Sequence, residues 1–337
     1  MLPTNTPNPR ALVDDQGRVH TDLRISVTDR CNLRCYYCMP AEGVRFRPHA
    51  EILSFEEIER FVRAAVPLGI RKIRLTGGEP LVRKGVVRLV EMLAAVPGID
   101  DLAMTTNGTL LDEFAEPLKA AGLHRLNISL DTLDRQKFQR ITRHDKFDQA
   151  IKGIAAARKA GFEGIKLNAL AIRDISEEEV VPLALFARDN QLLLRFIEFM
   201  PVDGDRQWYD GQVLHSERIV DILSAALGTP QPLAVNGSIA AAREYRFADG
   251  VQVGLIPSIT KPFCRKCNRL RLTADGQLRS CLFATHQWNV RTLLRDGGTD
   301  QQIEQLIRAV VQDKQKARGT RNGDFGRSDK TMHQIGG

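Results

Sequence analysis

The chain has 337 residues, of which 43% are hydrophobic and 26% are charged, a composition that excludes global disorder and allows a substantial buried core. Its length suits one barrel-sized catalytic domain with an extension. It contains no apolar run long enough to span a membrane, and residues 1–15 lack the apolar stretch of a secretory signal. We therefore expect a cytoplasmic protein that does not associate with a membrane.

The formal net charge of +7 favours an anionic partner. Lys and Arg are interspersed with Asp and Glu along most helix-like segments, whereas nucleic-acid binding usually concentrates them in a run or stripe. We therefore expect no nucleic-acid partner. A phosphorylated small molecule remains open as the anionic ligand.

Strand-like and helix-like segments alternate through the first 200 residues. The apolar segment 23–29 predicts a buried strand that leads into the first cysteines. Ser54, with Glu57 three residues later, predicts a capped helix start. The alternation then continues with strand-like segments at 72–76, 102–106, 125–130, 165–172 and 192–200, and with helix-like segments at 85–96, 110–122, 147–161 and 177–190.

About six strands separated by helices predict parallel pairing through right-handed crossovers. A closed eight-stranded barrel would need about 250 residues, so we predict an α/β fold with an incomplete (β/α)6 TIM-like barrel. A doubly wound open sheet has the same local pattern and stays open as an alternative. Both architectures place ligands at the carboxyl ends of the strands, where the sequence has TDRCNLRC, TGGEP, TTNG and FMPVDGD.

The regular alternation weakens after residue 200. Helix-like patterns remain at 216–228 and 301–319, separated by short polar segments and a second group of cysteines. We expect three regions: an N-terminal segment at 1–20, the partial barrel at 21–200, and a C-terminal extension at 201–337.

The cysteines give the most specific signal, because all six fall into two groups of three with different spacings: Cys31, Cys35 and Cys38, then Cys264, Cys267 and Cys281. A four-iron cubane held by three cysteines leaves one iron free for an external ligand. For the first group, the alternative is a zinc loop completed by a histidine, but His20 and His49 each lie eleven residues outside the group. For the second group alone, His286 could complete a structural zinc site.

The segment CNLRCYYC resembles the C-x3-C-x2-C signature of radical S-adenosylmethionine enzymes. In that family the free iron is chelated by the methionine moiety of the cofactor, and one-electron reduction releases a 5′-deoxyadenosyl radical. The resemblance implies that Cys31, Cys35 and Cys38 hold a [4Fe-4S] cluster and that Tyr37 contacts S-adenosylmethionine.

Further positions resemble cofactor-binding residues of the same family. Gly78 and Glu79 resemble the GGE motif that binds the methionine amino group, because glycine backbone allows close approach and a carboxylate accepts from an ammonium group. Ser129 in NISLD and Met200 in EFMP match cofactor-contacting positions. Taken alone, these two residues are more simply a strand hydroxyl and a core side chain.

The second cysteine group, with NRLRLTADG between its members, resembles the GTP 3′,8-cyclases, in which a second open [4Fe-4S] cluster contacts the guanine base. The resemblance implies that Cys264, Cys267 and Cys281 hold that cluster. It also implies a set of GTP-contacting residues, mostly cations suited to a triphosphate and placed at strand ends around one cavity: Arg24, Arg74, Thr105, Lys166, Arg269, Leu270 and Arg271.

Catalytic roles are implied for Arg24, in quenching a late radical, and for the terminal Gly336 and Gly337, which would enter the active site. The implied reaction is that of a lyase: hydrogen abstraction from C3′ of GTP and attack on C8, giving (8S)-3′,8-cyclo-7,8-dihydroguanosine 5′-triphosphate, the first step of molybdenum cofactor biosynthesis.

The implied partners are a downstream cyclic pyranopterin monophosphate synthase, an electron donor and a second copy in a homodimer. Two alternatives remain: another radical enzyme that acts on a peptide or a different nucleotide, and a zinc-stabilised nucleic-acid-binding protein.

Overall fold

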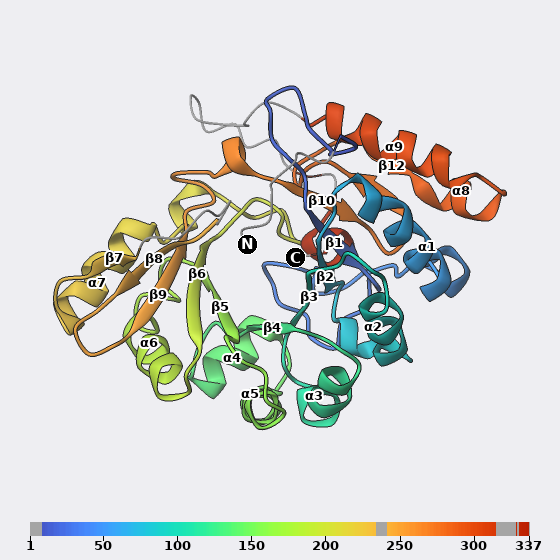
Figure 1. Cartoon of the computed structure of the whole chain (residues 1–337). Coiled ribbons are helices and arrows are strands. Elements are labelled where there is room, and N and C mark those ends of the chain that lie inside the picture. The colour runs from blue at the N-terminus through green and yellow to red at the C-terminus, as the bar shows by residue number, and fades with distance from the viewer. Residues whose placement is uncertain (1–8, 234–240, 315–327, 329, 337) are drawn as a thin grey trace, which may run out of the picture.

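The computed structural model describes residues 9–233, 241–314, 328 and 330–336, and these form twelve strands in one sheet (Figure 1). In sheet order the strands are β12 (Trp288–Asn289), β11 (Gln277–Arg279), β10 (Arg269–Leu272), β1 (Asp22–Ser26), β2 (Lys72–Thr76), β3 (Asp101–Thr106), β4 (Arg125–Ser129), β5 (Lys166–Ala171), β6 (Leu193–Glu198), β9 (Gln252–Ile256), β8 (Arg243–Arg246) and β7 (Gln231–Leu233).

The predicted strands form the centre of this sheet. β1 to β6 are parallel neighbours in chain order, which is the order of a singly wound barrel. A doubly wound sheet would instead reverse direction at a switch point. The sheet curves into an arch that β7 and β12 leave open at its two edges (Figure 1). The prediction of an incomplete α/β barrel is confirmed.

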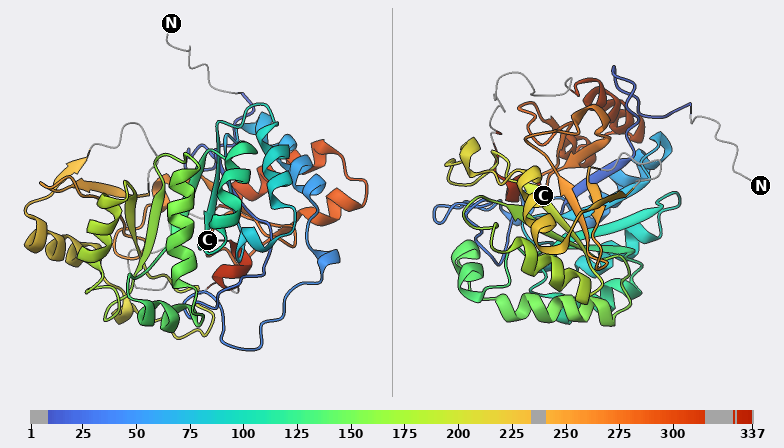
Figure 2. Two further views of the ribbon diagram at one scale, coloured as in Figure 1. Left: turned by 90° about the horizontal axis from the view of Figure 1, so that it is seen from below. Right: turned by 90° about the vertical axis from the view of Figure 1, so that its left-hand side faces the viewer.

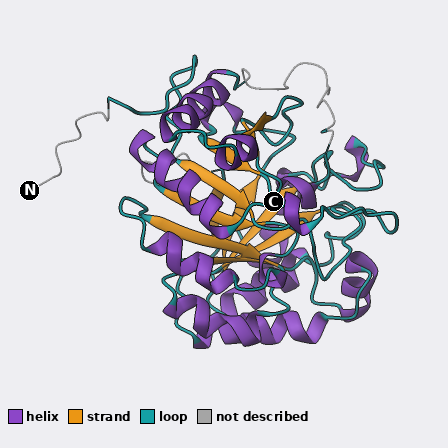
Figure 3. Cartoon of the chain, turned by 90° about the vertical axis from the view of Figure 1, so that its right-hand side faces the viewer, coloured by secondary structure: helices purple, strands orange, loops and turns teal. Residues whose placement is uncertain are grey.

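Helices cover the outer, convex face of the arch, as Figures 1 and 3 show. None of the helices in the described ranges has both the length and the apolar character needed to cross a membrane. The helices are α1 (Phe55–Ala65), α2 (Val86–Ala94), α3 (Leu111–Ala120), α4 (Arg135–Thr142), α5 (Phe147–Lys159), α6 (Val180–Asp189), α7 (Ser216–Leu227), α8 (Val290–Arg295), α9 (Asp300–Gln312) and α10 (Met332–Ile335), with short 3-10 turns at His49–Glu51, Val66–Leu68, Pro80–Val82, Asp210–Gln212 and Cys264–Lys266.

Local hydrogen bonds explain where helices begin. The predicted capping box at α1 is present: Ser54 Oγ accepts from Glu57 N at 3.1 Å, and Glu57 Oε2 accepts from Ser54 N at 2.6 Å. The sequence alone did not predict α4, an eight-residue and mostly polar helix. Its start is set by Asp134, whose carboxylate accepts from Lys137 N at 2.8 Å.

Burial alternates along the parallel strands. In β1, Leu23 and Ile25 are buried against the helices, whereas Arg24 between them points to the other face and is partly accessible. β5 shows the same alternation, with Leu167 buried and Lys166 partly accessible. A closed TIM barrel is filled by branched apolar side chains. The interior face of this barrel instead carries polar and charged side chains.

The C-terminal region completes the sheet on both sides. β9 pairs in parallel with β6, and β10 pairs in parallel with β1. Each edge then ends in short antiparallel strands. Figure 2 shows α10, near the C-terminus, lying against the barrel rather than projecting from it. The region expected to be an extension therefore supplies part of the barrel wall.

A buried carboxylate joins the two regions. Glu198, at the end of β6, accepts from the backbone N and Oγ of Ser216 at 3.0 and 2.9 Å, which fixes the start of α7. It also accepts from Ile259 N at 3.0 Å and from Thr260 N and Oγ1 at 2.8 and 2.7 Å. One side chain thus satisfies five donors in the segments that follow β6 and β9.

We expect Glu198→Ala to lower the free energy of unfolding by about 3 kcal/mol, because charge-assisted bonds are lost and buried donors are left unsatisfied. Thermal and urea unfolding of matched preparations measure this. Glu217→Ala is the control, since Glu217 is exposed and pairs with Lys261 on the surface; its effect should stay within about 0.5 kcal/mol. Equal stability of the two variants would contradict the role of Glu198.

Candidate active site

The loop that carries the first cysteine group is held by the loop after β2. Gly78 N donates to Thr28 O, and Glu79 N donates to Arg30 O, each at 2.8 Å. A Cβ on Gly78 would collide with the backbone carbonyl of Arg30. The sequence predicted that Gly78 allows close approach to a ligand. The structure shows that its missing side chain also lets two loops of the chain itself come together.

Glu79 is buried at the junction of these loops. Its carboxylate accepts from Thr106 Oγ1 and from Asn107 N, both at 2.7 Å, and from Leu81 N at 3.1 Å. Burial nevertheless raises the pKa of Glu79 to about 7. A nearby cation would stabilise the charged form of this buried carboxylate. Glu79 therefore fits the ammonium group of a bound amino acid moiety.

Asn107 connects Glu79 to the first cysteine group. Its Nδ2 donates to Asn32 Oδ1 at 2.9 Å and lies 3.8 Å from Cys31 Sγ. Thr109 Oγ1 closes the network by accepting from Asn32 Nδ2 at 2.9 Å. The sequence marked TTNG as a strand end but did not single out Asn107; its position at the carboxyl end of β3 was the available signal.

The three thiols of the first group lie close together in low-dielectric surroundings. Burial raises the pKa of Cys31 to about 11 and that of Cys38 to about 12, and it raises the pKa of Cys35 well above its ordinary value. Cys31 further raises the pKa of Cys38, and both raise that of Cys35. Such thiols become thiolates readily only next to a strong positive centre, which a metal cluster provides.

The thiol set suits a cluster in which each thiolate binds a different iron. Within the described ranges, no three His, Cys, Asp or Glu side chains are gathered closely enough to hold one metal ion.

Tyr37 and Asp131 brace the cysteine loop against the opposite wall. Tyr37 Oη donates to Asp131 Oδ2 at 2.5 Å, and Leu170 N donates to Asp131 Oδ1 at 2.8 Å. Ser129, two residues before Asp131, ends β4 and pairs with Asn168 on β5. Tyr37, Gly78 and Glu79 therefore follow the ends of β1 and β2, Ser129 ends β4, and Met200 follows β6. Asp131, the partner of Tyr37, is a residue that the sequence did not reveal.

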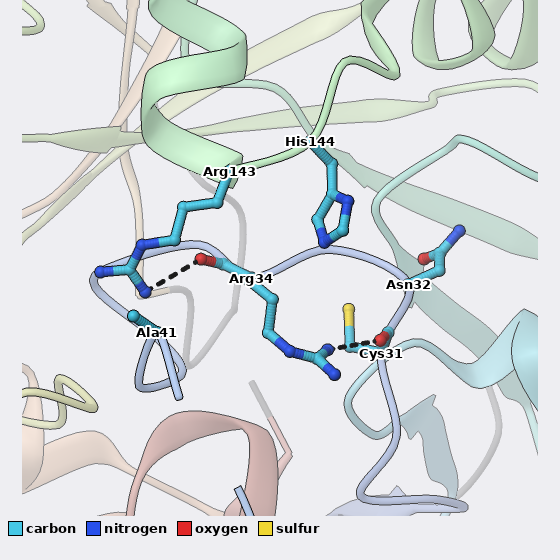
Figure 4. A pocket seen from close by; sticks show the side chains of 6 residues that line it. All are labelled: Cys31, Asn32, Arg34, Ala41, Arg143 and His144. Carbon is cyan, nitrogen blue, oxygen red and sulfur yellow. Dashed lines mark hydrogen bonds between the residues drawn. The ribbon is translucent and has the colours of Figure 1, made fainter. Parts of the chain in front are cut away.

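A cavity of about 390 Å³ opens beside this group (Figure 4). Arg34 Nη1 donates to Cys31 O at 2.7 Å, and Arg143 Nη1 donates to Arg34 O at 3.3 Å. The Cys31 thiol points into the cavity (Figure 4). Its walls are Cys31, Asn32, Arg34, Ala41, Arg143 and His144.

The interior face of the barrel carries cations that the strand register aligns. Arg24 on β1 pairs with Arg74 on β2 and with Arg271 on β10, so three arginines form one row across the sheet. Lys166 on β5 and Arg195 on β6 lie on the same face. The sequence placed the predicted cations at strand ends, whereas the structure places them within the strands, facing the interior.

These cations repel one another. Burial lowers the pKa of Arg24 well below its ordinary value, and the charges of Arg269, Arg271 and Arg74 lower it further. Burial also lowers the pKa of Arg74 and Arg271 to about 10 each. Within the described part of the chain, the Nε atoms of Arg24, Arg74 and Arg195 are buried without a hydrogen-bond partner. The row of arginines therefore carries an excess of positive charge and fits a polyanion.

The pKa of Lys166 is lowered into the neutral range. Burial lowers its pKa to about 7, followed in effect by the charges of Arg195, Arg125 and Arg74. Arg195 was not predicted from the sequence. It stands as a single cation among apolar residues in LLRFIE, the same pattern that surrounds Arg24 and Arg74, and this pattern would have identified it.

Two predicted substrate contacts, Thr105 and Leu270, are not cations and have other surroundings. Thr105 is on the interior face of β3, where its Oγ1 accepts from Asn127 Nδ2 at 3.4 Å. The side chain of Leu270 is buried in the apolar core, and its place in β10 leaves only the backbone available to a ligand.

The second cysteine group lies at the other end of the barrel. Cys264 and Cys267 precede β10, whose first residue Arg269 is paired with Asp22 at the start of β1, whereas the first group follows the end of β1. Burial alone would raise the pKa of Cys267, but Lys314, Arg269 and Arg271 outweigh burial and lower it. This environment favours the thiolate of Cys267 and fits a second cluster.

Two of the three histidines considered as zinc ligands have other partners. His286 is exposed, lies 3.4 Å from the Asp313 carboxylate and stacks on Trp288. His20 is buried and hydrogen-bonded to Asp14 at 3.0 Å.

The C-terminal helix brings the end of the chain to the interior. Ile335 of α10 packs with Val202 and Leu282, against which Met200 also lies. Arg271 Nη1 donates to Gly336 O, and Gly336 lies against Thr76 and Ser26 with a φ of 82°. Gly336 thus reaches the cationic row, while Gly337 lies outside the described residues.

Comparisons with known proteins agree with this geometry. The Radical SAM superfamily model matches residues 25–187, and the Molybdenum Cofactor Synthesis C model matches residues 192–320. A GTP 3′,8-cyclase of Rhodopirellula baltica is 49% identical over 99% of this chain and 94% of its own length. One of Pelotomaculum thermopropionicum is 46% identical over 94% of this chain and 97% of its own length.

A solved structure supports the fold. Streptococcus suis SuiB bound to S-adenosylmethionine aligns with a TM-score of 0.60 at 16% identity, covering 81% of this chain. The alignment covers 64% of the SuiB chain, just under two thirds of its length.

Proposed function

The chain belongs to the GTP 3′,8-cyclases, the radical S-adenosylmethionine enzymes of molybdenum cofactor synthesis, and we propose that the interior of its barrel holds GTP between two [4Fe-4S] clusters. The reaction is conversion of GTP to (8S)-3′,8-cyclo-7,8-dihydroguanosine 5′-triphosphate. The observation that carries the proposal is the row of mutually repelling arginines, Arg271, Arg24 and Arg74, which lies between the two cysteine groups.

At the carboxyl end of the strands, the first cysteine group would hold one cluster. There, the Glu79 carboxylate accepts a hydrogen bond from the ammonium group of S-adenosylmethionine. When bound there, the cluster and its cofactor supply the radical that removes hydrogen from C3′ of the substrate. Around them, Gly78 keeps two loops in contact and Tyr37 braces the cysteine loop through Asp131. Ser129 and Met200 complete the proposed cofactor site.

The interior cations bind the substrate. A triphosphate supplies the negative charge that the row of arginines lacks, and Arg forks bind phosphate oxygens in two-point geometry. Lys166 and Arg195 extend the same charged wall onto β5 and β6. The proposed GTP contacts are Arg24, Arg74, Thr105, Lys166, Arg195, Arg269, Leu270 through its backbone, and Arg271.

At the opposite end, Cys264, Cys267 and Cys281 would hold the second cluster, which would supply an iron site for the guanine base. We assign residues 21–200 to radical generation and residues 201–337 to this second cluster and the base. Binding at both ends fixes C3′ and C8 of one nucleotide relative to each other, which is the contribution that the protein makes to the ring closure.

Arg24 and the terminal glycines have proposed catalytic roles. Arg24 stands in the middle of the cationic row, beside the proposed substrate. The hydrogen bond from Arg271 to Gly336 supports a role for Gly336 and Gly337 at the same site. We also propose a cytoplasmic homodimer that takes electrons from a donor protein and passes its product to cyclic pyranopterin monophosphate synthase.

The activity is tested with protein reconstituted and assayed without oxygen. Reduced protein with S-adenosylmethionine and GTP should yield 5′-deoxyadenosine and the cyclised nucleotide, and it should contain about eight irons. Cys281→Ala should retain about four.

Three outcomes count against this proposal. Deoxyadenosine formation that does not respond to GTP would indicate a different substrate, and absence of both products would refute the activity. A colourless protein with stoichiometric zinc would support the nucleic-acid-binding alternative.

The substrate site should also show a pH dependence. Lys166 has a pKa of about 7 in the free protein, and a bound triphosphate should raise it, so GTP binding takes up a proton above pH 7. Affinity should then fall as pH rises from 7.5 to 9, by at most about tenfold per pH unit. Calorimetry in buffers of different ionisation enthalpy measures the proton uptake directly.

Lys166→Arg is the matched control, because arginine stays protonated throughout this range. Its affinity should depend less on pH than that of the unaltered protein. Equal slopes for the two proteins would show that Lys166 does not titrate on binding.

A further inference from the structure

We propose that Lys314 is a positioning residue for the second cysteine group: its buried ammonium group holds Cys267 and the start of β10 together and offsets the thiolate charge. This inference rests on the second cluster of the proposed function and assigns a charge partner to it. It does not concern the cations that line the substrate site.

The ammonium group of Lys314 is in direct contact with Cys267 and with Arg269, the first residue of β10. Its Nζ lies 3.7 Å from Cys267 Sγ and donates to Arg269 O at 2.7 Å. Lys314 lies two residues beyond the end of α9, and only 7% of it is exposed. A lysine this deeply buried is expensive unless anionic or strongly polar groups receive its charge.

The backbone around Lys314 is fixed independently by the N-terminal turn. Arg18 Nη1 donates to Cys264 O at 2.8 Å, and Arg18 Nη2 donates to Lys314 O at 3.3 Å. One buried arginine therefore binds both the second cysteine loop and the segment that carries the lysine.

Arg18 is itself held in place. Asp14 Oδ2 accepts from Arg18 Nε at 2.5 Å and lies 3.0 Å from His20 Nε2. All three residues are buried, and a backbone bridge between Val13 and Val19 closes the turn. These contacts join three distant parts of the chain at the second cysteine group, so the position of Lys314 is fixed by buried hydrogen bonds rather than by a chance surface contact.

A fixed cation beside a thiolate ligand has a predictable effect on a redox cluster. Reduction adds a negative charge, and a nearby positive charge in a low-dielectric site stabilises the reduced state more than the oxidised one. Lys266 lies in the same loop, one residue from Cys267, but is exposed. Water and salt screen its charge, so its influence should be much smaller.

The test is an EPR-monitored redox titration of the reconstituted full chain. Lys314→Gln removes the charge and keeps a donor for Arg269 O. Lys266→Met is the matched control, and the signal lost in Cys281→Ala identifies the second cluster.

For Lys314→Gln we expect the equilibrium constant for reduction of the second cluster to fall at least tenfold, which is about 59 mV for one electron. The first cluster should be unchanged in the same sample, and Lys266→Met should match the unaltered protein at both clusters.

Iron retention under chelator challenge is the second readout and does not require a measurable potential. Lys314→Met, which also loses the donor, should release about four irons faster than Lys266→Met, while first-cluster iron is retained and shows that the protein is folded.

An unchanged potential in Lys314→Gln together with unchanged iron release in Lys314→Met would overturn the inference. If the unaltered protein itself holds only about four irons, the second cluster of the proposed function has failed instead.

Discussion

Repulsion among cations that face the inside of the barrel is the constraint on which the rest of the structure depends. Neighbouring strands lie about 4.8 Å apart, so the parallel register brings Arg271, Arg24 and Arg74 side by side. At an effective dielectric constant of about 20, two unit charges at such separations repel by about 3.5 kcal/mol. This repulsion destabilises the free protein, in a wall where apolar side chains would not repel one another. A bound polyanion would replace the repulsion with attraction.

The same register separates the two cysteine groups. Because β10 runs parallel to β1, the cysteines before β10 and those after β1 must lie at opposite ends of the barrel. Two clusters placed in this way can hold a single extended ligand at its two ends, with the cations between them. The surroundings also differ: burial and neighbouring groups raise the pKa values of the first thiols, whereas Lys314 and two arginines lower that of Cys267.

Local pattern was enough to predict the six central strands and the capped start of α1, because alternation and capping involve residues close in sequence. It could not show that β9 and β10 join the two sides of the sheet, since their pairing with β6 and β1 links distant segments. For the same reason it assigned the cations to strand ends. The cysteine groups and Glu79 were found by motif. Arg195, Asp131 and Lys314 were missed, because each is defined by partners far along the chain.

The affinity of the reconstituted protein for GTP compared with guanosine tests the central claim most directly. If the interior cations bind the triphosphate, GTP should bind at least about a hundredfold more tightly at low salt, and added salt should narrow the difference. Equal affinities, or a difference that salt leaves unchanged, would contradict the account, because the charged wall would then have no part in holding the substrate.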